Sequence, residues 1–462
     1  MKKPQLLSFM LLVVFMITTG GAVMAQDPDS VRYNQYGVPV NRTKLNVELR
    51  GGSLVFETDD QSTRIWTDVR VQADGAVFFG EPLNPIGNGT SIRRARFGIK
   101  TYFLNHWYGE FDMDISNSEL EVKDAYLEYN FKKYSENGGL QLRVGNFKEP
   151  FSLEMNTTSR YLTFIERANV VAIFAPSRHI GTMASYQKNW FVGYAGIHFQ
   201  DIGGLEERTF SEDNNKDYGM DEGYSFTGRM ALMPFYNNPD YGIHLGAAAS
   251  YRTPTTEQEI PGTIRYSTRS LTSINRKKYI DSDDIANVDH ALLGGLEFAA
   301  YYKGLRFQGE YIMNNVTIKN DGGTEKFSGF YVFGSWILFG GKHQYNTNDG
   351  EFTQVGRGKK WGDIELAFRY DYLTLNSRME GIMGGAGDGY TFGINYHAND
   401  NVKIMLNYAL LNHDRYANGR GKLFVGHDID GNLTKNPATV VDDAGTAGND
   451  YSFLGVRFEV DF

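Results

Sequence analysis

Apolar and polar side chains alternate with a period of two along most of this chain. In the segment 64–74, the odd positions carry Ile, Thr, Val and Ala, whereas the even positions carry Arg, Trp, Asp and Gln. The segments 107–116 and 124–131 show the same separation into an apolar and a charged face. A helix would distribute such charges around its whole circumference. The pattern therefore predicts β-strands with one apolar and one polar face.

Continued along the chain, the alternation predicts sixteen strands. We expect them at 64–79, 92–104, 107–116, 123–131, 139–147, 179–187, 190–199, 224–233, 241–252, 290–302, 305–318, 327–339, 363–376, 389–398, 402–412 and 451–462. None of the 12 prolines lies in these segments, as expected if each strand interior needs its backbone N–H groups. Most even-numbered links are short and the long links are mainly odd-numbered, which is typical of an antiparallel outer-membrane β-barrel with turns on one side and loops on the other.

The twelfth link, 340–362, is an exception because it is long although it lies on the turn side. We expect it to fold into the lumen. Its basic residues are Lys342, Arg357, Lys359 and Lys360.

The first 25 residues have the features of a secretory signal peptide. Lys2 and Lys3 precede an apolar stretch, and small residues precede a cleavage point before Gln26. The apolar stretch has about 12 residues, which is too short to cross a bilayer. We assign 1–25 to the signal peptide, 26–61 to an N-terminal periplasmic segment with a small hairpin, and 62–462 to the transmembrane barrel.

Composition excludes several other classes of protein. The chain has 52 Gly, 29 Tyr and 31 Phe among 462 residues, which is typical of aromatic strands joined by glycine-rich turns. It has no cysteine, so thiol catalysis and cysteine-ligated zinc are excluded. A formal charge of -9 disfavours binding to nucleic acid.

The last predicted strand ends the chain with an apolar face. It resembles the carboxy-terminal strand by which outer-membrane barrels are recognised for assembly. We therefore expect the barrel assembly machinery to be a partner, through the strand ending at Phe462, and outer-membrane lipid to surround the barrel. The apolar positions are Leu454, Val456, Phe458, Val460 and Phe462.

Several segments resemble a known family of proteins. The run RVGNFKEPFSLEMNTTSRYLTFIERANVVAIFAPSRHIG, 143–181, resembles the third external loop and its flanks in the phosphate-selective porin O and P family. SIRRARFGIK (91–100), DAYLEYNF (124–131), GDIELAFRYDYLTLN (362–376) and NVKIMLNY (401–408) extend the resemblance over most of the chain. It implies a homotrimer of sixteen-stranded barrels in a Gram-negative outer membrane, with the third external loop folded inward as a constriction.

The polar faces of the strands supply candidate anion-binding residues in the lumen. Arg94, Arg96 and Lys100 lie two and four residues apart, so they project from one face. Guanidinium groups offer paired donors to phosphate oxygens, and several weak sites in series favour passage over retention. The expected pore-lining residues are Arg94, Arg96, Lys100, Arg70, Arg143, Lys148, Arg160, Arg167 and Arg178.

The same faces carry a similar number of carboxylates, which leaves the selectivity open. If the arginines are free at the narrowest point, the channel passes anions such as phosphate. If they pair with carboxylates, or face a row of them across the lumen, it is a general diffusion porin for small polar solutes. A non-conducting structural or adhesin barrel and an outer-membrane hydrolase are further alternatives.

Signals for catalysis and for cofactors are weak. No Gly-x-Ser-x-Gly or paired-histidine motif occurs, so we expect no enzyme, no cofactor and no metal site. We assign the glycine-rich run 384–389 to an external hairpin loop. The aromatic residues Tyr102, Phe103, Trp107 and Tyr108 could be mistaken for a track on which sugars stack, but we assign them to the interfacial girdles.

Overall fold

A computed structural model describes residues 32–41, 43–80, 82–116, 118, 120–133, 138–200, 202, 220–254, 256–257, 262–377, 381–443 and 446–462. The predicted signal peptide, 1–25, lies outside these residues. The chain divides into two compact units, Met1–Asn46 and Val47–Phe462. In the first unit, β1 (Arg32–Tyr33) and β2 (Pro39–Val40) form an antiparallel pair.

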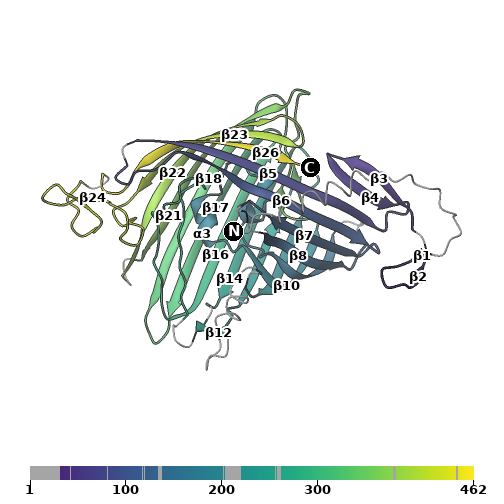
Figure 1. Cartoon of the computed structure of the whole chain (residues 1–462), viewed down its shortest axis with the longest axis horizontal. Coiled ribbons are helices and arrows are strands. Elements are labelled where there is room, and N and C mark those ends of the chain that lie inside the picture. Colours follow the sequence, from purple (N-terminus) through teal and green to yellow (C-terminus); the bar gives the residue numbers. More distant parts are fainter. Residues whose placement is uncertain are drawn as a thin grey trace, which may run out of the picture. The chain divides into compact units, whose positions relative to one another are not determined.

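Sixteen antiparallel strands of the described chain form a closed barrel (Figure 1). Each strand pairs with the next one along the chain, and β26 pairs with β5 to close the ring. The strands are β5 (Arg64–Phe79), β6 (Gly89–Phe103), β7 (Trp107–Asp114), β8 (Glu121–Asn130), β9 (Gly139–Lys148), β10 (Arg178–Lys188), β11 (Phe191–His198), β13 (Ser225–Leu232), β14 (Tyr241–Arg252), β16 (Val288–Tyr302), β17 (Leu305–Ile318), β18 (Thr324–Ile337), β21 (Asp363–Ser377), β22 (Ile382–His397), β23 (Val402–His413) and β26 (Tyr451–Asp461). The predicted all-β barrel is confirmed.

The links contain short elements. The expected hairpin before the barrel is β3 (Leu45–Arg50) and β4 (Ser53–Thr58), and β4 pairs with the start of β5. The link between β9 and β10 holds α2 (Leu153–Asn156), a 3-10 turn η1 (Ser159–Tyr161) and α3 (Asn169–Phe174). Other links contain β12 (Met220–Asp221), β15 (Thr256–Glu257), β19 (Tyr345–Asn346), β20 (Glu351–Phe352), β24 (Gly426–His427) and β25 (Leu433–Thr434).

None of the described helices is long and apolar enough to cross a membrane.

The two faces of the strands separate as the alternation predicts. Arg70 is 5% exposed, whereas its neighbour Val71 is 41% exposed. On the partner strand β26, Arg457 is fully buried and Phe458 is 55% exposed. Polar side chains therefore point into the barrel and apolar ones form its outer surface, as a barrel surrounded by lipid requires.

An apolar core fills one part of the barrel interior. It consists of residues from the β9–β10 link packed against strands on the far side of the ring. Val170 and Val171 of α3 lie in the same buried cluster as Tyr331 of β18 and Leu373 of β21. The open space of the lumen is consequently displaced toward the wall made by β5 to β10.

The glycine-rich run 384–389 is not an external loop, because β22 begins seven residues earlier than predicted and includes it. The glycines let neighbouring segments approach the strand closely. A Cβ at Gly384 would lie 2.8 Å from the Ser282 Cα, and one at Gly385 would lie 2.5 Å from the Ala417 Cα. Gly385 also has a φ of 90°, which disfavours other residues. The glycines reflect close packing rather than a turn.

Candidate functional site

The link 149–177 between β9 and β10 is anchored at its start by a short capped helix. The Ser152 side chain accepts a hydrogen bond from the Met155 N–H at 3.1 Å. The Glu310 carboxylate of β17 accepts from the N–H groups of Leu153 at 3.1 Å and Glu154 at 2.7 Å. These contacts satisfy the free N–H groups at the start of α2.

Two cations bind the other end of α2. Lys148 Nζ donates to the carbonyl oxygens of Met155 and Asn156, both at 3.0 Å. Arg167 donates to the carbonyl oxygens of Glu154 and Thr157, both at 2.9 Å. The last carbonyl groups of a helix lack partners within it and attract positive charge. The helix thus holds both cations without neutralising them.

The middle of the link, from Arg160 to Glu166, is fixed to the inner wall by buried basic residues. Arg457 of β26 donates to the Ile165 carbonyl oxygen at 2.6 Å. Arg369 of β21 donates to the Glu166 carbonyl oxygen at 2.9 Å, and Lys403 of β23 donates to the Arg160 carbonyl oxygen at 2.7 Å. Hydrogen bonds from three inward-facing side chains hold the link against the wall opposite β9 and β10.

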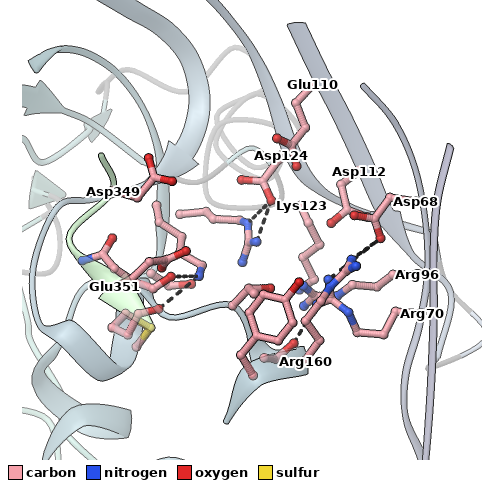
Figure 2. A pocket seen from close by; sticks show the side chains of 18 of the residues that line it. Asp68, Arg70, Arg96, Glu110, Asp112, Lys123, Asp124, Arg160, Asp349 and Glu351 are labelled. Carbon is pink, nitrogen blue, oxygen red and sulfur yellow. Dashed lines mark hydrogen bonds and ion pairs between the residues drawn. The ribbon is translucent and has the colours of Figure 1, made fainter. Parts of the chain in front are cut away.

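A cavity of about 750 Å³ lies between this link and the wall from β5 to β10 (Figure 2). All nine residues that the sequence analysis selected line it. Eleven basic and seven acidic side chains line the cavity in total. The basic residues are Arg70, Arg93, Arg94, Arg96, Lys100, Lys123, Arg143, Lys148, Arg160, Arg167 and Arg178. The acidic residues are Asp68, Glu110, Asp112, Asp124, Glu166, Asp349 and Glu351.

Five of the nine predicted residues form close ion pairs. Each is held by a carboxylate on a barrel strand. The distances between side-chain nitrogen and carboxylate oxygen are 2.9 Å for Arg96 and Asp114, 2.9 Å for Lys100 and Asp68, 2.7 Å for Arg143 and Glu128, 3.1 Å for Arg160 and Asp461, and 2.6 Å for Arg178 and Asp124. Arg160 also pairs with Asp68. These charges are largely compensated.

The other four predicted residues have mainly neutral partners. Arg94 donates to the Gln72 carboxamide oxygen at 2.6 Å, and Arg70 donates to the Ser159 hydroxyl at 2.7 Å with the Asp68 carboxylate no nearer than 4.0 Å. Lys148 and Arg167 donate to backbone carbonyls, and neither they nor Arg94 form an ion pair with a described carboxylate. Burial lowers the pKa of Arg167 to about 10, so it is still charged at neutral pH. The cavity therefore contains four basic side chains without close carboxylate partners.

Arg93 is a cavity-lining residue that the alternation missed. The β5–β6 register shifts between Gln72 and Ala73, where Arg94 and Ile92 are their partners, so Arg93 is an extra residue in β6. A bulge of this kind redirects side chains, and Arg93 lines the cavity next to Arg94. Its Nε lies 2.6 Å from the Glu166 carboxylate. The sequence signal was the Arg93-Arg94 doublet within an alternating strand.

Basic residues of the barrel wall determine the charge state of Glu166 in the link 149–177. Burial alone would raise the pKa of the Glu166 carboxyl group. Arg93 and Arg457 outweigh the burial and hold that pKa well below its ordinary value. Glu166 is therefore ionised and ties the link to β6 and β26.

The turn-side segment 338–362 contributes acidic side chains to the cavity. Its tip reaches the inner wall, where the Gly350 carbonyl oxygen accepts from Arg229 at 3.1 Å and the Asp349 carbonyl oxygen accepts from Tyr194 at 3.2 Å. Asp349 and Glu351 line the cavity on the side opposite Arg70 and Arg96 (Figure 2).

The four basic residues that the sequence analysis named in this segment do not line the cavity. They are Lys342, Arg357, Lys359 and Lys360. Two of them pair with neighbouring turns: Lys342 with Asp240 at 3.1 Å, and Arg357 with Asp400 at 2.8 Å. Lys359 and Lys360 are exposed.

The assignment of Tyr102 and Tyr108 to an interfacial girdle is wrong. Both share the inward face of their strands with Lys100 and Glu110, and both line a second cavity inside the barrel. Phe103 and Trp107, one residue away on the outward face, stack on each other with centroids 6.2 Å apart. Proximity to the strand ends was a weaker guide than the alternation itself.

Comparisons with known proteins agree with this architecture. A model of the family described as phosphate-selective porin O and P matches residues 65–431. Porin O of Pseudomonas aeruginosa is 23% identical over 424 residues, which cover 86% of this chain and 93% of that protein.

Two solved structures share the fold. An anion-selective porin from Comamonas acidovorans has a TM-score of 0.50 at 14% identity, over 87% of this chain and 100% of that chain. A trimer form of OmpT from Vibrio cholerae has a TM-score of 0.50 at 10% identity, over 87% of this chain and 100% of that one. At these identities, both structures support the fold alone.

Proposed function

The chain belongs to the phosphate-selective porin O and P family, and from this premise we propose that its lumen passes small anions, phosphate among them, in preference to cations. The protein is a porin of the Gram-negative outer membrane and not an enzyme. The anion preference, the homotrimeric assembly, the recognition of the strand ending at Phe462 by the assembly machinery and the removal of residues 1–25 are parts of the proposal. The Vibrio cholerae neighbour has a trimer form, so an assembly of this kind is compatible with the shared fold.

The observation that carries the anion preference is the excess of basic over acidic side chains in the lining of the cavity. The whole chain has a formal charge of -9, yet eleven basic and only seven acidic side chains line the cavity. Four of the basic groups have mainly neutral partners, so their charge acts on a passing ion. Guanidinium and ammonium groups in series replace the hydration of an anion without holding it permanently.

A second candidate function is supported by the opposed acidic side chains. Asp349 and Glu351 lie across the cavity from Arg70 and Arg96 (Figure 2). A transverse field between such rows orients dipolar solutes and favours general diffusion of small polar molecules. The charge state of this acidic pair decides between the two functions.

The chloride conductance of the purified protein in planar bilayers, titrated with inorganic phosphate, tests the proposal. If phosphate occupies the basic cavity, the chloride current should fall in a saturable way as phosphate is added. A current that increases in proportion to added phosphate, as in free solution, would contradict binding within the channel.

We expect the anion preference to decline between pH 7 and pH 9. Burial and the neighbouring Asp349 carboxylate raise the pKa of Glu351 to about 8, although Lys148, Arg229 and Arg167 act against that rise. Below pH 8 the Glu351 carboxyl group is mostly protonated and neutral, and above pH 8 it adds a negative charge to the cavity. The ratio of anion to cation permeability, measured from reversal potentials at each pH, should therefore fall across this range.

Glu351→Gln is the matched control for the pH dependence. Because glutamine does not titrate, the variant should keep the neutral-pH permeability ratio up to pH 9. A decline of equal size in the variant and the unmutated protein would assign the titration to another group.

A further inference from the structure

Four aromatic side chains form an arc on the inner wall of the barrel. They are Trp66 of β5, Tyr102 of β6, Tyr108 of β7 and Tyr126 of β8, so consecutive strands supply one ring each. Ring centroids lie 5.6 Å apart between Trp66 and Tyr102, 4.7 Å between Tyr102 and Tyr108, and 5.8 Å between Tyr108 and Tyr126. All four are half-buried. The short turn 104–106 places the arc at the turn side of the barrel.

One carboxylate fixes the orientation of two of the four rings. The hydroxyl groups of Tyr108 and Tyr126 both donate to Glu110, at 2.7 Å and 2.9 Å. Since these hydroxyls are engaged, the parts of Tyr108 and Tyr126 left for a solute are mainly the ring faces and edges. A rigid aromatic surface loses little entropy when a ligand stacks on it.

A second cavity of about 270 Å³ adjoins the arc. Tyr102, Tyr108 and Tyr126 line it, together with the carboxamide side chains of Asn130, Gln141 and Asn348. Its charged lining residues are Glu128, Lys132, Lys133, Arg143 and Asp349. Tyr126, Gln141, Arg143, Gln187 and Asp349 line both this cavity and the large basic one, so the two are contiguous. Tyr102 and Tyr108 do not line the basic cavity.

This combination of groups suits a sugar ring better than a bare anion. The face of an aromatic ring is electronegative, so it attracts C–H groups and repels anions. Carboxamide groups both donate and accept hydrogen bonds, which matches the hydroxyl groups of a sugar. An inorganic anion gains nothing from the arc, whereas a solute with a charged end and a polyol end fits both cavities.

We propose that the arc is a subsite for the sugar ring of a phosphorylated monosaccharide whose phosphate group lies in the basic cavity. The inference rests on the proposed anion function and extends it to a class of solute. Arg143 connects the two parts, because its guanidinium lies 4.3 Å from the centre of the Tyr126 ring and it also lines the basic cavity.

Blockade of the chloride current in planar bilayers tests the inference, with inorganic phosphate, glucose 6-phosphate and glucose as separate probes. In the unmutated protein, the half-blocking concentration of glucose 6-phosphate should be at least about fivefold lower than that of phosphate, since stacking contributes about two- to tenfold per ring. Tyr102→Ala combined with Tyr108→Ala should raise the glucose 6-phosphate value about fivefold or more. The phosphate value should change less than about twofold, because these rings are outside the basic cavity.

Two further variants keep the test decisive. Tyr102→Phe combined with Tyr108→Phe keeps both rings and should retain the preference for glucose 6-phosphate. Tyr129→Ala removes a tyrosine from the outward face of β8, where it contacts Trp107, and should change neither value.

Equal half-blocking concentrations of phosphate and glucose 6-phosphate in the unmutated protein would overturn the inference. So would an unchanged glucose 6-phosphate value in the double alanine variant. Block by glucose 6-phosphate and glucose without block by phosphate would instead overturn the proposed anion function while supporting the sugar subsite.

Discussion

Replacing Arg94 and Lys148 with glutamine should lower the ratio of anion to cation permeability by about fourfold or more. Both basic side chains line the cavity and have only neutral hydrogen-bond partners, a carboxamide for Arg94 and backbone carbonyls for Lys148. One unit charge at about 8 Å from an ion contributes roughly 0.5 kcal/mol in water and about 2 kcal/mol at an effective dielectric constant of 20. Each lost cation therefore changes the local anion concentration at least about twofold.

Reversal potentials across a tenfold KCl gradient measure this change. The matched control is Arg415→Gln combined with Lys360→Gln, which removes the same charge from residues outside the cavity lining. Arg415 resembles Arg94 and Lys148 in having neutral partners, the carbonyl oxygens of Val440 and Asp442. The control should leave the reversal potential almost unchanged. Equal shifts in both double variants would mean that net charge, and not the cavity, determines selectivity.

Arg457→Leu should destabilise the folded barrel by about 3–5 kcal/mol, because it breaks a buried ion pair and leaves one partner behind. The Arg457 guanidinium is fully buried and binds both oxygens of Asp74 at 2.7 Å, across the seam where β26 meets β5. It also donates to the Ile165 carbonyl oxygen and lies 3.2 Å from the Glu166 carboxylate. Its loss would leave the buried Asp74 carboxylate without its ion-pair partner and would remove one attachment of the link 149–177. We therefore also expect a higher single-channel conductance.

Urea-induced unfolding of the protein in lipid vesicles measures the stability, with Asp74→Asn as the second arm of a double-mutant cycle. The double variant should lose less than the sum of the two single variants, since the pair acts as a unit. Lys342→Leu removes one partner of an exposed ion pair with Asp240 and should cost only about 0–1 kcal/mol. A cost of the same small size for Arg457→Leu would show that the seam does not depend on this ion pair.

The alternation was sufficient to locate the strands, because the polarity of each side chain indicates which face of the strand it occupies. Fifteen of the sixteen strands begin and end within three residues of their predicted positions, and the exception is the start of β22. There the glycines were interpreted as a turn, although their role is to admit Ser282 and Ala417 from other loops. That packing is a long-range property which local sequence does not contain.

The composition of the cavity could also be predicted, but the pairing of its charges could not. A face assignment places Arg94 and Arg96 in the lumen without showing that Asp114 neutralises Arg96 while Gln72 is the partner of Arg94. Such partners depend on the register between strands. The bulge at Arg93 and the tip of the 338–362 segment likewise follow from contacts between residues far apart in the chain.

The reversal potential of the unmutated protein in a KCl gradient at pH 7 tests the central claim most directly. If the unneutralised cations of the cavity govern permeation, the zero-current potential should have the sign that marks chloride as the more permeant ion. A potential of the opposite sign would mean that the acidic side chains dominate, and the anion channel proposed for this barrel would be rejected.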